Sequence, residues 1–246
     1  MVWEEKMNVI GLIPCAGKGK RVGFPYPKEL FPDLRFDQYH PIFMNVFDSM
    51  IKLVNEIVIV IDEQRGPLIN YLKNNSPDNV NIYFVLQKEA ISLPHAILQA
   101  YPLIKNKYVL FGMPDTVIID SKCFEKIYQV LFNNNYDLIC GCFKTNTPEK
   151  FGMVEFKNET DLIKRFVDKP KNYTKSDWMW GILAWSPTFS ATLKKYFKMQ
   201  NYNLTNDTMN IFAKMQRAIG IKFKNTFYYD FGTIEEIVDF VRKEVI

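Results

Sequence analysis

Residues 8–30 read NVIGLIPCAGKGKRVGFPYPKEL, and no other stretch of the chain is as informative about the fold. It begins as an apolar run typical of a buried strand and then places three glycines, Gly17, Gly19 and Gly23, within seven residues. Lysines and an arginine surround these glycines. A buried strand that leads into a glycine-rich basic loop predicts a backbone that closes around a small, strongly negative ligand.

Short apolar runs rich in β-branched or aromatic residues recur along the first half of the chain, at 56–62, 81–86, 107–113 and 136–143. Segments with the periodicity of an amphipathic helix lie between them, at 41–54, 66–74, 89–103 and 121–133. Strand alternating with helix predicts an α/β fold with a mainly parallel sheet and helices on both faces. Such sheets bind ligands at the carboxyl ends of their strands, so we expect the glycine-rich loop at that edge.

The pattern changes after residue 143. Strands with long connections are predicted at 152–156, 162–168, 179–186 and 223–232, and helices near 188–198, 206–219 and 233–244. No linker rich in glycine, serine or proline separates the halves. We therefore predict a single domain, 1–246, with a mainly parallel half (about 1–143) and a smaller, more antiparallel lobe with a closing helix (about 144–246).

The composition is that of a globular protein. Of 246 residues, 48% are hydrophobic and 15% are aromatic, which excludes an intrinsically disordered chain. No apolar run approaches the roughly 20 residues that a membrane-spanning helix needs. The first ten residues carry acids where a signal peptide has a basic segment. We therefore expect a cytoplasmic protein without a membrane partner.

Cysteine and charge patterns exclude further classes. The four cysteines lack zinc-binding spacing and the chain has only two histidines, so we expect reduced, partly buried thiols without a metal or redox role. Basic residues outnumber acidic ones by 31 to 27 and form no block that would track a nucleic-acid backbone. This small excess suits a small polyanionic substrate. Neither a monomer nor a homo-oligomer is excluded.

Three ligands compete for the glycine-rich loop. A dinucleotide fold needs G-x-G-x-x-G and an acid about 20 residues further on, but here the third glycine comes one residue late and Asp62 is much further away. The P-loop string G-x-x-x-x-G-K-[ST] is absent. A triphosphate cradle remains, in which backbone N–H groups approach the phosphates and Arg21 and Lys28 supply charge. A solvated basic turn is the alternative without function.

The loop also resembles that of sugar nucleotidyltransferases, whose G-x-G-[TS]-R and P-K-x-L motifs are matched by CAGKGKR and PKEL. Further resemblances follow in the family's order: VLQKEAISLPHAILQAYPLI (85–104), VLFGMPDTVIID (109–120), FGMVEF (151–156), FVDKP (166–170) and YYDFGTIEEI (228–237). They resemble, in turn, the segment that reads a pyrimidine base, the metal-binding strand end of UTP–glucose-1-phosphate uridylyltransferases, two sugar-phosphate motifs and the ending of glucose-1-phosphate thymidylyltransferases. Each match alone is weak, whereas the loop and these five segments, six matches in the family's order, are specific.

The resemblance implies a Rossmann-like fold of the nucleotide-diphospho-sugar transferase type and a Mg²⁺-dependent reaction. In that reaction dTTP or UTP condenses with a sugar 1-phosphate to give a nucleotide sugar and pyrophosphate. It implies that Arg21 grips the β- and γ-phosphates and that Lys28 lies near the α-phosphate. The nucleotide-binding residues would be Ala16, Gly17, Gly19, Lys20, Gln87 and Ser92. The sugar-phosphate-binding residues would be Gly152, Asp168, Lys169 and Trp180, and the metal ligands Asp115 and Asp230.

The chemistry of some of these side chains agrees with the resemblance. One amide, that of Gln87, can donate to a carbonyl of uracil or thymine and accept from the ring N3–H. His95 is expected to be a helix residue near that site rather than a catalyst. Trp178 and Trp180 could line a sugar pocket or pack in the core.

Departures from the family pattern leave alternatives open. Lys20 replaces Thr or Ser, and Lys28 comes only seven positions after Arg21, as in the R-M-G-x-x-x-P-K of methylerythritol-phosphate cytidylyltransferases. A cytidylyltransferase for a polyol or other non-sugar phosphate is therefore the alternative enzyme. Ser92 in place of glycine and Asp168 in place of glutamate leave the base and the sugar open. A catalytically silent nucleotide-sensing relative would be expected to lose a metal-binding aspartate or a phosphate-binding lysine, and this chain retains them.

Overall fold

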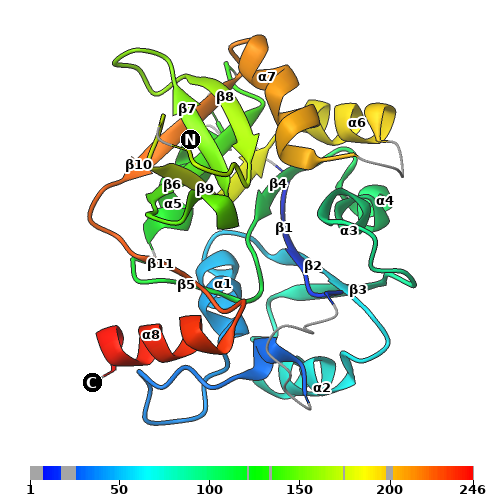
Figure 1. The fold of residues 1–246 in the computed structure, drawn as a ribbon. Coiled ribbons are helices and arrows are strands. Elements are labelled where there is room, and N and C mark those ends of the chain that lie inside the picture. Colours follow the sequence, from blue (N-terminus) through cyan, green and yellow to red (C-terminus); the bar gives the residue numbers. More distant parts are fainter. Residues whose placement is uncertain are drawn as a thin grey trace, which may run out of the picture.

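The computed structural model describes residues 8–17, 26–120, 122–132, 135–173, 175–197 and 202–245. Within these ranges the main sheet has nine strands: β1 (Val9–Pro14), β2 (Glu56–Ile61), β3 (Asn81–Leu86), β4 (Tyr108–Phe111), β6 (Leu138–Lys144), β7 (Gly152–Phe156), β8 (Ile163–Asp168), β9 (Trp178–Trp185) and β10 (Ala218–Phe223). A separate two-stranded sheet pairs β5 (Thr116–Ile118) with β11 (Tyr228–Asp230). Figure 1 shows the main sheet running through both halves of the chain.

The main sheet follows the order β10-β6-β9-β4-β1-β2-β3. Strands β4, β1, β2 and β3 are mutually parallel, and β9 enters between β4 and β6 antiparallel to both. The hairpin of β7 and β8 extends from β9. The predicted α/β class, with a mainly parallel sheet and a smaller antiparallel part, is confirmed.

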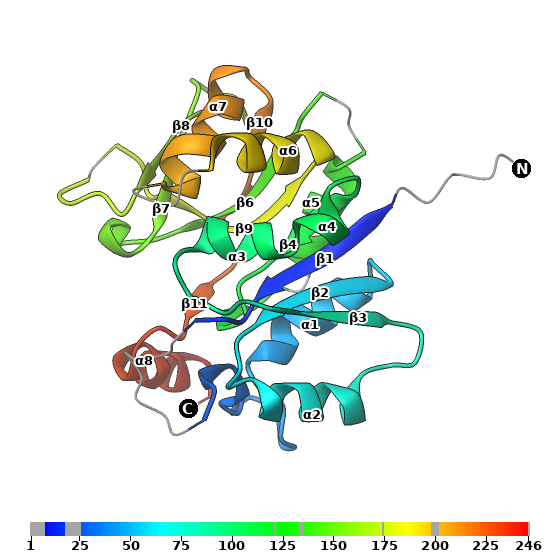
Figure 2. The same cartoon turned by 90° about the vertical axis from the view of Figure 1, so that its right-hand side faces the viewer.

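Helices cover both faces of this sheet, as Figure 2 shows for β1 to β3. Alternate strand residues point to opposite faces. One face packs on α1 (Phe43–Ile51), α2 (Gly66–Asn75) and α5 (Lys122–Val130). The other packs on α3 (Leu93–Gln99), α4 (Tyr101–Ile104), α6 (Pro187–Tyr196) and α7 (Asn210–Lys214). Three shorter helical turns are η1 (Lys28–Leu30), η2 (Pro148–Lys150) and the π-helix η3 (Leu204–Met209).

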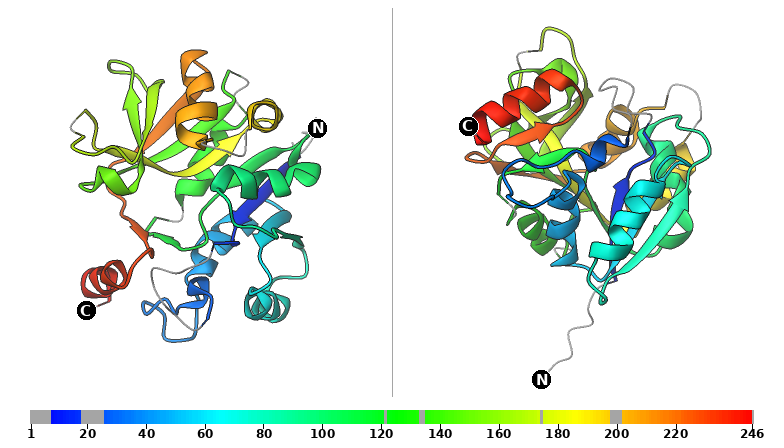
Figure 3. Two further views of the ribbon diagram at one scale, coloured as in Figure 1. Left: turned by 45° about the vertical axis from the view of Figure 1, so that its right-hand side comes forward. Right: turned by 90° about the horizontal axis from the view of Figure 1, so that it is seen from below.

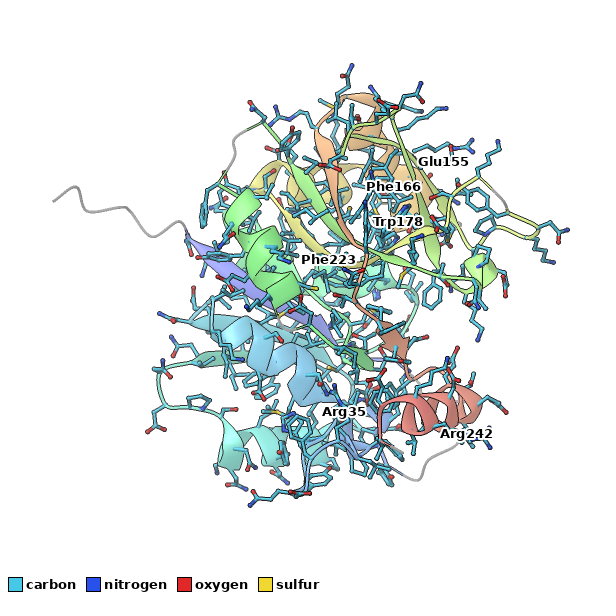
Figure 4. The ribbon with its side chains drawn as sticks, turned by 90° about the vertical axis from the view of Figure 1, so that its left-hand side faces the viewer. Arg35, Glu155, Phe166, Trp178, Phe223 and Arg242 are labelled. Atoms are coloured by element: carbon cyan, nitrogen blue, oxygen red, sulfur yellow. The ribbon has the colours of Figure 1, made fainter. Side chains whose placement is uncertain are left out.

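The last helix, α8 (Ile234–Glu244), lies below the β5–β11 sheet and beside the segment that follows η1 (Figures 1 and 3). Its Phe240 packs on Phe231 with ring centroids 5.0 Å apart, and Phe231 lies 6.4 Å from Phe31. Arg35 lies next to α8 in Figure 4, with its guanidinium 5.4 Å from the Phe240 ring. Lys150 of η2 forms an ion pair with Glu236 at 2.6 Å. The contacts with Phe31 and Arg35 bring the end of the described chain against its first half.

Some predicted boundaries were wrong. The helix expected over 206–219 ends at Lys214, because Gln216 takes a left-handed φ of 58° and residues 218–223 pair with β6 as a strand. The helix expected from 89 begins only after Ser92, and the strand expected over 223–232 is divided between β10 and β11. The short strand β5 was not predicted. No helix among the described residues is long and apolar enough to cross a membrane.

Candidate active site

A cavity of about 390 Å³ opens at the carboxyl ends of β1 and β3. Ten residues line it, and four of them are predicted nucleotide-binding residues: Ala16, Gly17, Gln87 and Ser92. Its other walls are mostly apolar, from Pro14, Ala90, Ile91, Leu93, Ala96 and Met113. The parallel strands explain the clustering, because residues after β1 and after β3 meet at one edge of the sheet. The space beside Gly17 is open, which leaves room for a ligand against its backbone.

Gln87 brings a single buried amide to this cavity. Only 3% of the residue is exposed, and its backbone N–H donates to the Ile61 carbonyl at 2.7 Å, which fixes it at the end of β3. Its Nε2 lies 2.7 Å from Nδ1 of His95, and Nε2 of that imidazole lies 3.1 Å from the Gln99 amide. Ser92 caps α3, where its hydroxyl accepts the His95 N–H at 3.4 Å. His95 is thus a helix residue beside the cavity, as predicted.

Two predicted metal ligands meet near the same edge. Asp115 comes four residues after β4, and its backbone oxygen accepts the Phe231 N–H at 2.9 Å. Asp230 pairs in the β5–β11 register with Thr116, the residue next to Asp115. The two-stranded sheet therefore brings together aspartates 115 positions apart in the sequence.

The Lys28 ammonium donates to Oδ2 of Asp115 in a largely buried ion pair. Burial alone would lower the pKa of Lys28, but the charge of Asp115, with further contributions from Asp230 and Glu29, outweighs it and raises the pKa above its ordinary value. One predicted phosphate-binding cation and both predicted metal ligands therefore form one electrostatic cluster.

The cluster fits a magnesium ion on one further observation. Oδ1 of Asp115 is buried and has no hydrogen-bond partner among the described residues, so a buried carboxylate oxygen is left for a cation or water. Mg²⁺ is commonly held by one or two carboxylates plus substrate phosphates. Among the described residues no group of three or more His, Cys, Asp or Glu side chains could hold a metal ion. Asp115 and Asp230 remain the predicted pair of carboxylates for such an ion.

The four predicted sugar-phosphate residues are brought together on β7, β8 and β9. Gly152 pairs with Asp168 in the β7–β8 register, and the Lys169 N–H donates to the Phe151 carbonyl at 2.9 Å. Lys169 is exposed and has a left-handed φ of 44°, an uncommon backbone conformation for lysine that is enriched at functional sites. The Trp180 indole lies over Gly152, and its buried N–H has no partner in the part of the chain that the structure describes.

Three asparagines attach η3 and α7 to strand β8. Asn203 donates to the Asp168 carboxylate at 2.7 Å, and Asn206 accepts the Asp168 N–H at 2.9 Å. Asn210 bonds both backbone groups of Phe166, at 2.8 and 3.0 Å. The segment before Lys169 is therefore held by side chains as well as by its partner strand. One carboxylate oxygen of Asp168 accepts a hydrogen bond from Asn203, a contact that the sequence did not predict.

Gly152→Ala tests how closely the indole packs on this strand. A Cβ at Gly152 would overlap the indole nitrogen of Trp180, so the tryptophan must move. We expect the free energy of unfolding to fall by about 1–3 kcal/mol, the usual cost of overpacking. Chemical denaturation measures this effect. Gly66→Ala is the matched control, because no atom lies within 4 Å of its added Cβ.

A buried ionic cluster next to Gly17 was missed. Arg65, 3% exposed, donates to the Gly17 carbonyl at 2.5 Å, to Asp62 at 3.1 Å and to Glu29 at 3.4 Å. Burial raises the pKa of Glu29, and Arg65 opposes that shift. The available signal was an arginine just after the apolar strand β2, at the edge where the loop lies. Gly19, Lys20 and Arg21, also predicted to bind the triphosphate, lie outside the described residues.

Gly17 and the cavity lie at the carboxyl edge of the parallel strands, where open α/β sheets bind ligands, and the paired aspartates lie nearby. The whole arrangement is a fold of the nucleotidyltransferase type. The chain belongs to the nucleotidyl transferase family, whose sequence pattern matches residues 10–245. The resemblance found in the sequence motifs is thereby confirmed.

All four described cysteines are free and fully buried.

Known proteins resemble this chain in sequence and in structure. The bifunctional protein GlmU of Methanococcus maripaludis is 28% identical over 163 residues, which are 65% of this chain and 35% of that protein. The chain thus spans about a third of the length of this curated relative. A protein assigned as a glucose-1-phosphate thymidylyltransferase from Bacillus anthracis, in complex with a sucrose, superposes with a TM-score of 0.82 at 18% identity, covering 97% of this chain and 96% of its own. The UTP-bound UGPase of Acinetobacter baumannii gives 0.81 at 15% identity, with 96% and 93% covered. These two structures share the fold.

Proposed function

We propose that this protein is a Mg²⁺-dependent sugar-1-phosphate nucleotidyltransferase that uses UTP or dTTP and releases pyrophosphate. The observation that carries the proposal is the cluster of Lys28, Asp115 and Asp230 beside the cavity that holds Gln87. Met113 connects the two, because it lines the cavity and lies two residues before Asp115. The arrangement offers a place for a base next to a place for phosphates and a cation.

The reaction suits these residues. An oxygen of the sugar phosphate attacks the α-phosphorus of the triphosphate, the new P–O bond forms, and the bond to the bridging oxygen breaks as pyrophosphate leaves. Two polyanions must be brought together in line, so positioning and charge neutralisation supply most of the catalysis. Lys28 would neutralise charge near the α-phosphate, and Lys169 would hold the sugar phosphate. No side-chain nucleophile takes part.

Asp115 and Asp230 would hold the magnesium ion. When bound, the ion would neutralise phosphate charge and fix the phosphate oxygens. The Asp115 carboxylate, with one oxygen on Lys28 and one buried without a partner, would orient the ammonium and contact the cation at the same time. Lys28 therefore stays charged and directed at the region where the α-phosphate would lie.

The experiment is a pyrophosphate-release screen of the purified protein. UTP, dTTP, CTP, ATP and GTP are each combined with a panel of sugar 1-phosphates and alditol phosphates, with and without Mg²⁺. We expect release only with Mg²⁺, and fastest with UTP or dTTP plus one sugar 1-phosphate. If no pair of substrates releases pyrophosphate, the proposed enzymatic activity is contradicted and a nucleotide-sensing protein is favoured.

One sequence feature favours a second candidate. The short spacing between Arg21 and Lys28 resembles that of methylerythritol-phosphate cytidylyltransferases. A preference for CTP with an alditol phosphate in the same screen would replace the leading proposal by this one.

Two charge removals should affect different substrates. Arg21→Ala should weaken use of the triphosphate, and Lys169→Ala should raise KM for the sugar phosphate, because each cation is assigned to one phosphate. A charged hydrogen bond is worth about 1.5–3 kcal/mol, or roughly ten- to a hundredfold. KM and kcat for both substrates measure the split, with the exposed Lys214→Ala as control. Equal effects of both variants on both substrates would undo the assignment.

A further inference from the structure

We infer that His95 is a positioning residue that makes the site prefer uracil or thymine over cytosine, because it fixes which end of the Gln87 amide faces the base. The inference rests on the proposed function, in which Gln87 reads the base. It concerns the row of side chains Gln99, His95 and Gln87 that runs from helix α3 into the cavity.

The imidazole couples the two amides. Nδ1 of His95 lies 2.7 Å from Nε2 of Gln87, and the other ring nitrogen lies 3.1 Å from the Gln99 amide. A neutral imidazole has one donor and one acceptor nitrogen, so one glutamine must present N–H to the ring and the other must present oxygen. As it stands, Gln99 points its Nε2 at the ring and donates weakly to the His95 carbonyl at 3.4 Å, and turning its amide would give up only that long bond at a half-buried position. Gln87, in contrast, is 97% buried within the wall of the cavity. The favoured arrangement therefore has Nδ1 accepting from Gln87 and Nε2–H donating to the Gln99 oxygen.

The ring itself is held in place. It stacks on Phe197 with centroids 6.2 Å apart and an interplanar angle of 29°, and Ser92 accepts the His95 backbone N–H. Phe197 follows helix α6, which packs against α3, and Ser92 lines the cavity. The acceptor at Nδ1 therefore stays at one position relative to Gln87.

This arrangement determines the edge that Gln87 presents. One N–H is used on the ring, which leaves the amide oxygen and the second N–H for a ligand. In uracil and thymine N3 carries a proton and position 4 carries a carbonyl, so oxygen meets N3–H and N–H meets the carbonyl. In cytosine N3 is an acceptor and position 4 carries an amine, and both contacts would be mismatched. Only a turned amide would suit cytosine, and turning it would place two acceptors, the Gln87 oxygen and Nδ1, against each other.

The test measures binding of UTP and CTP in the presence of Mg²⁺ by titration calorimetry, for the wild type and three variants. His95→Phe keeps a ring on Phe197 but removes the acceptor. His95→Asp restores an acceptor near the position of Nδ1. Gln99→Ala, a control on the same helix, removes the other partner of the ring at a site where water can replace it.

We expect the wild type to bind UTP at least tenfold more tightly than CTP, since an unmatched buried polar group costs about tenfold. The ratio of the two dissociation constants should fall about tenfold in His95→Phe. It should recover in His95→Asp, whatever its overall affinity, and change less than threefold in Gln99→Ala. A merely structural role of His95 would weaken both nucleotides alike.

Each of three results would overturn the inference. The first is no preference for UTP in the wild type, and the second is an unchanged ratio of dissociation constants in His95→Phe. The third is loss of the preference in His95→Asp, provided that thermal unfolding shows this variant to be folded. The readout is independent of turnover. If the protein binds UTP selectively but releases pyrophosphate with none of the sugar phosphates, the proposed function is contradicted. The role of His95 in selecting the base is then still supported.

Discussion

Asp115→Asn is expected to lower kcat for pyrophosphate release by about 10²–10³-fold, the usual loss when one preorganised electrostatic contact is removed from an active site. The neutral amide would weaken both contacts assigned to Asp115. It would no longer form the ion pair with Lys28, and it would halve the carboxylate charge that Asp115 and Asp230 offer a cation. Asp230→Asn should behave in the same way.

Initial rates over a range of Mg²⁺ concentrations measure this effect, and the apparent affinity for Mg²⁺ should fall together with kcat. Asp239→Asn is the matched control. It makes the same chemical change at an exposed position on α8, where Asp239 pairs with Lys243 at 2.8 Å, and should alter neither quantity. A near-normal rate of Asp115→Asn at limiting Mg²⁺ would show that Asp115 is not a metal ligand.

Arg65→Met is expected to lower the free energy of unfolding by about 3–5 kcal/mol, the cost of breaking a buried ion pair on one side. The variant leaves the buried Glu29 without its countercharge and the Gly17 carbonyl without its donor. Because Gly17 opens the glycine-rich loop, KM for the triphosphate should rise as well. Denaturant titration and steady-state kinetics measure the two effects.

A double-mutant cycle separates charge from packing. The double variant Arg65→Met/Glu29→Gln has no unpaired buried carboxylate at position 29. Its free energy of unfolding should therefore be higher than that of Arg65→Met alone. Arg242→Met is the control, because Arg242 lies exposed on α8, as Figure 4 shows, and should cost no more than about 0.5 kcal/mol. Equal stability of Arg65→Met and Arg242→Met would mean that the buried cluster contributes nothing.

Sequence reasoning recovered the parts of this protein that depend on local pattern. The apolar runs predicted the parallel strands β1 to β4. Because the carboxyl ends of parallel strands meet at one edge, this order also predicted that Gly17, Gln87 and Ser92 lie near one another. The sugar-phosphate motifs likewise meet, because Gly152 and Asp168 are partners in one hairpin. The roles of these residues remain predictions.

The missed features depend on tertiary pairing. Arg65 reaches Glu29 from 36 positions away, and no spacing rule connects an arginine after β2 with a glutamate in η1. The sequence AIGIKF follows a helical stretch and could continue it, but its pairing with β6 makes it strand β10. The contact between Gln87 and His95 could not be predicted, since it depends on how α3 packs against the end of β3.

The pairing of β5 with β11 also sets an order of events during synthesis. Asp115 leaves the ribosome 115 residues before Asp230, which at about 5–20 residues per second is a delay of roughly 6–23 seconds. By the start of that interval all the residues that line the cavity, 14 to 113, have been made, whereas the pair of aspartates cannot yet form. The last strand of the described chain to be synthesised therefore completes the carboxylate pair of the candidate site.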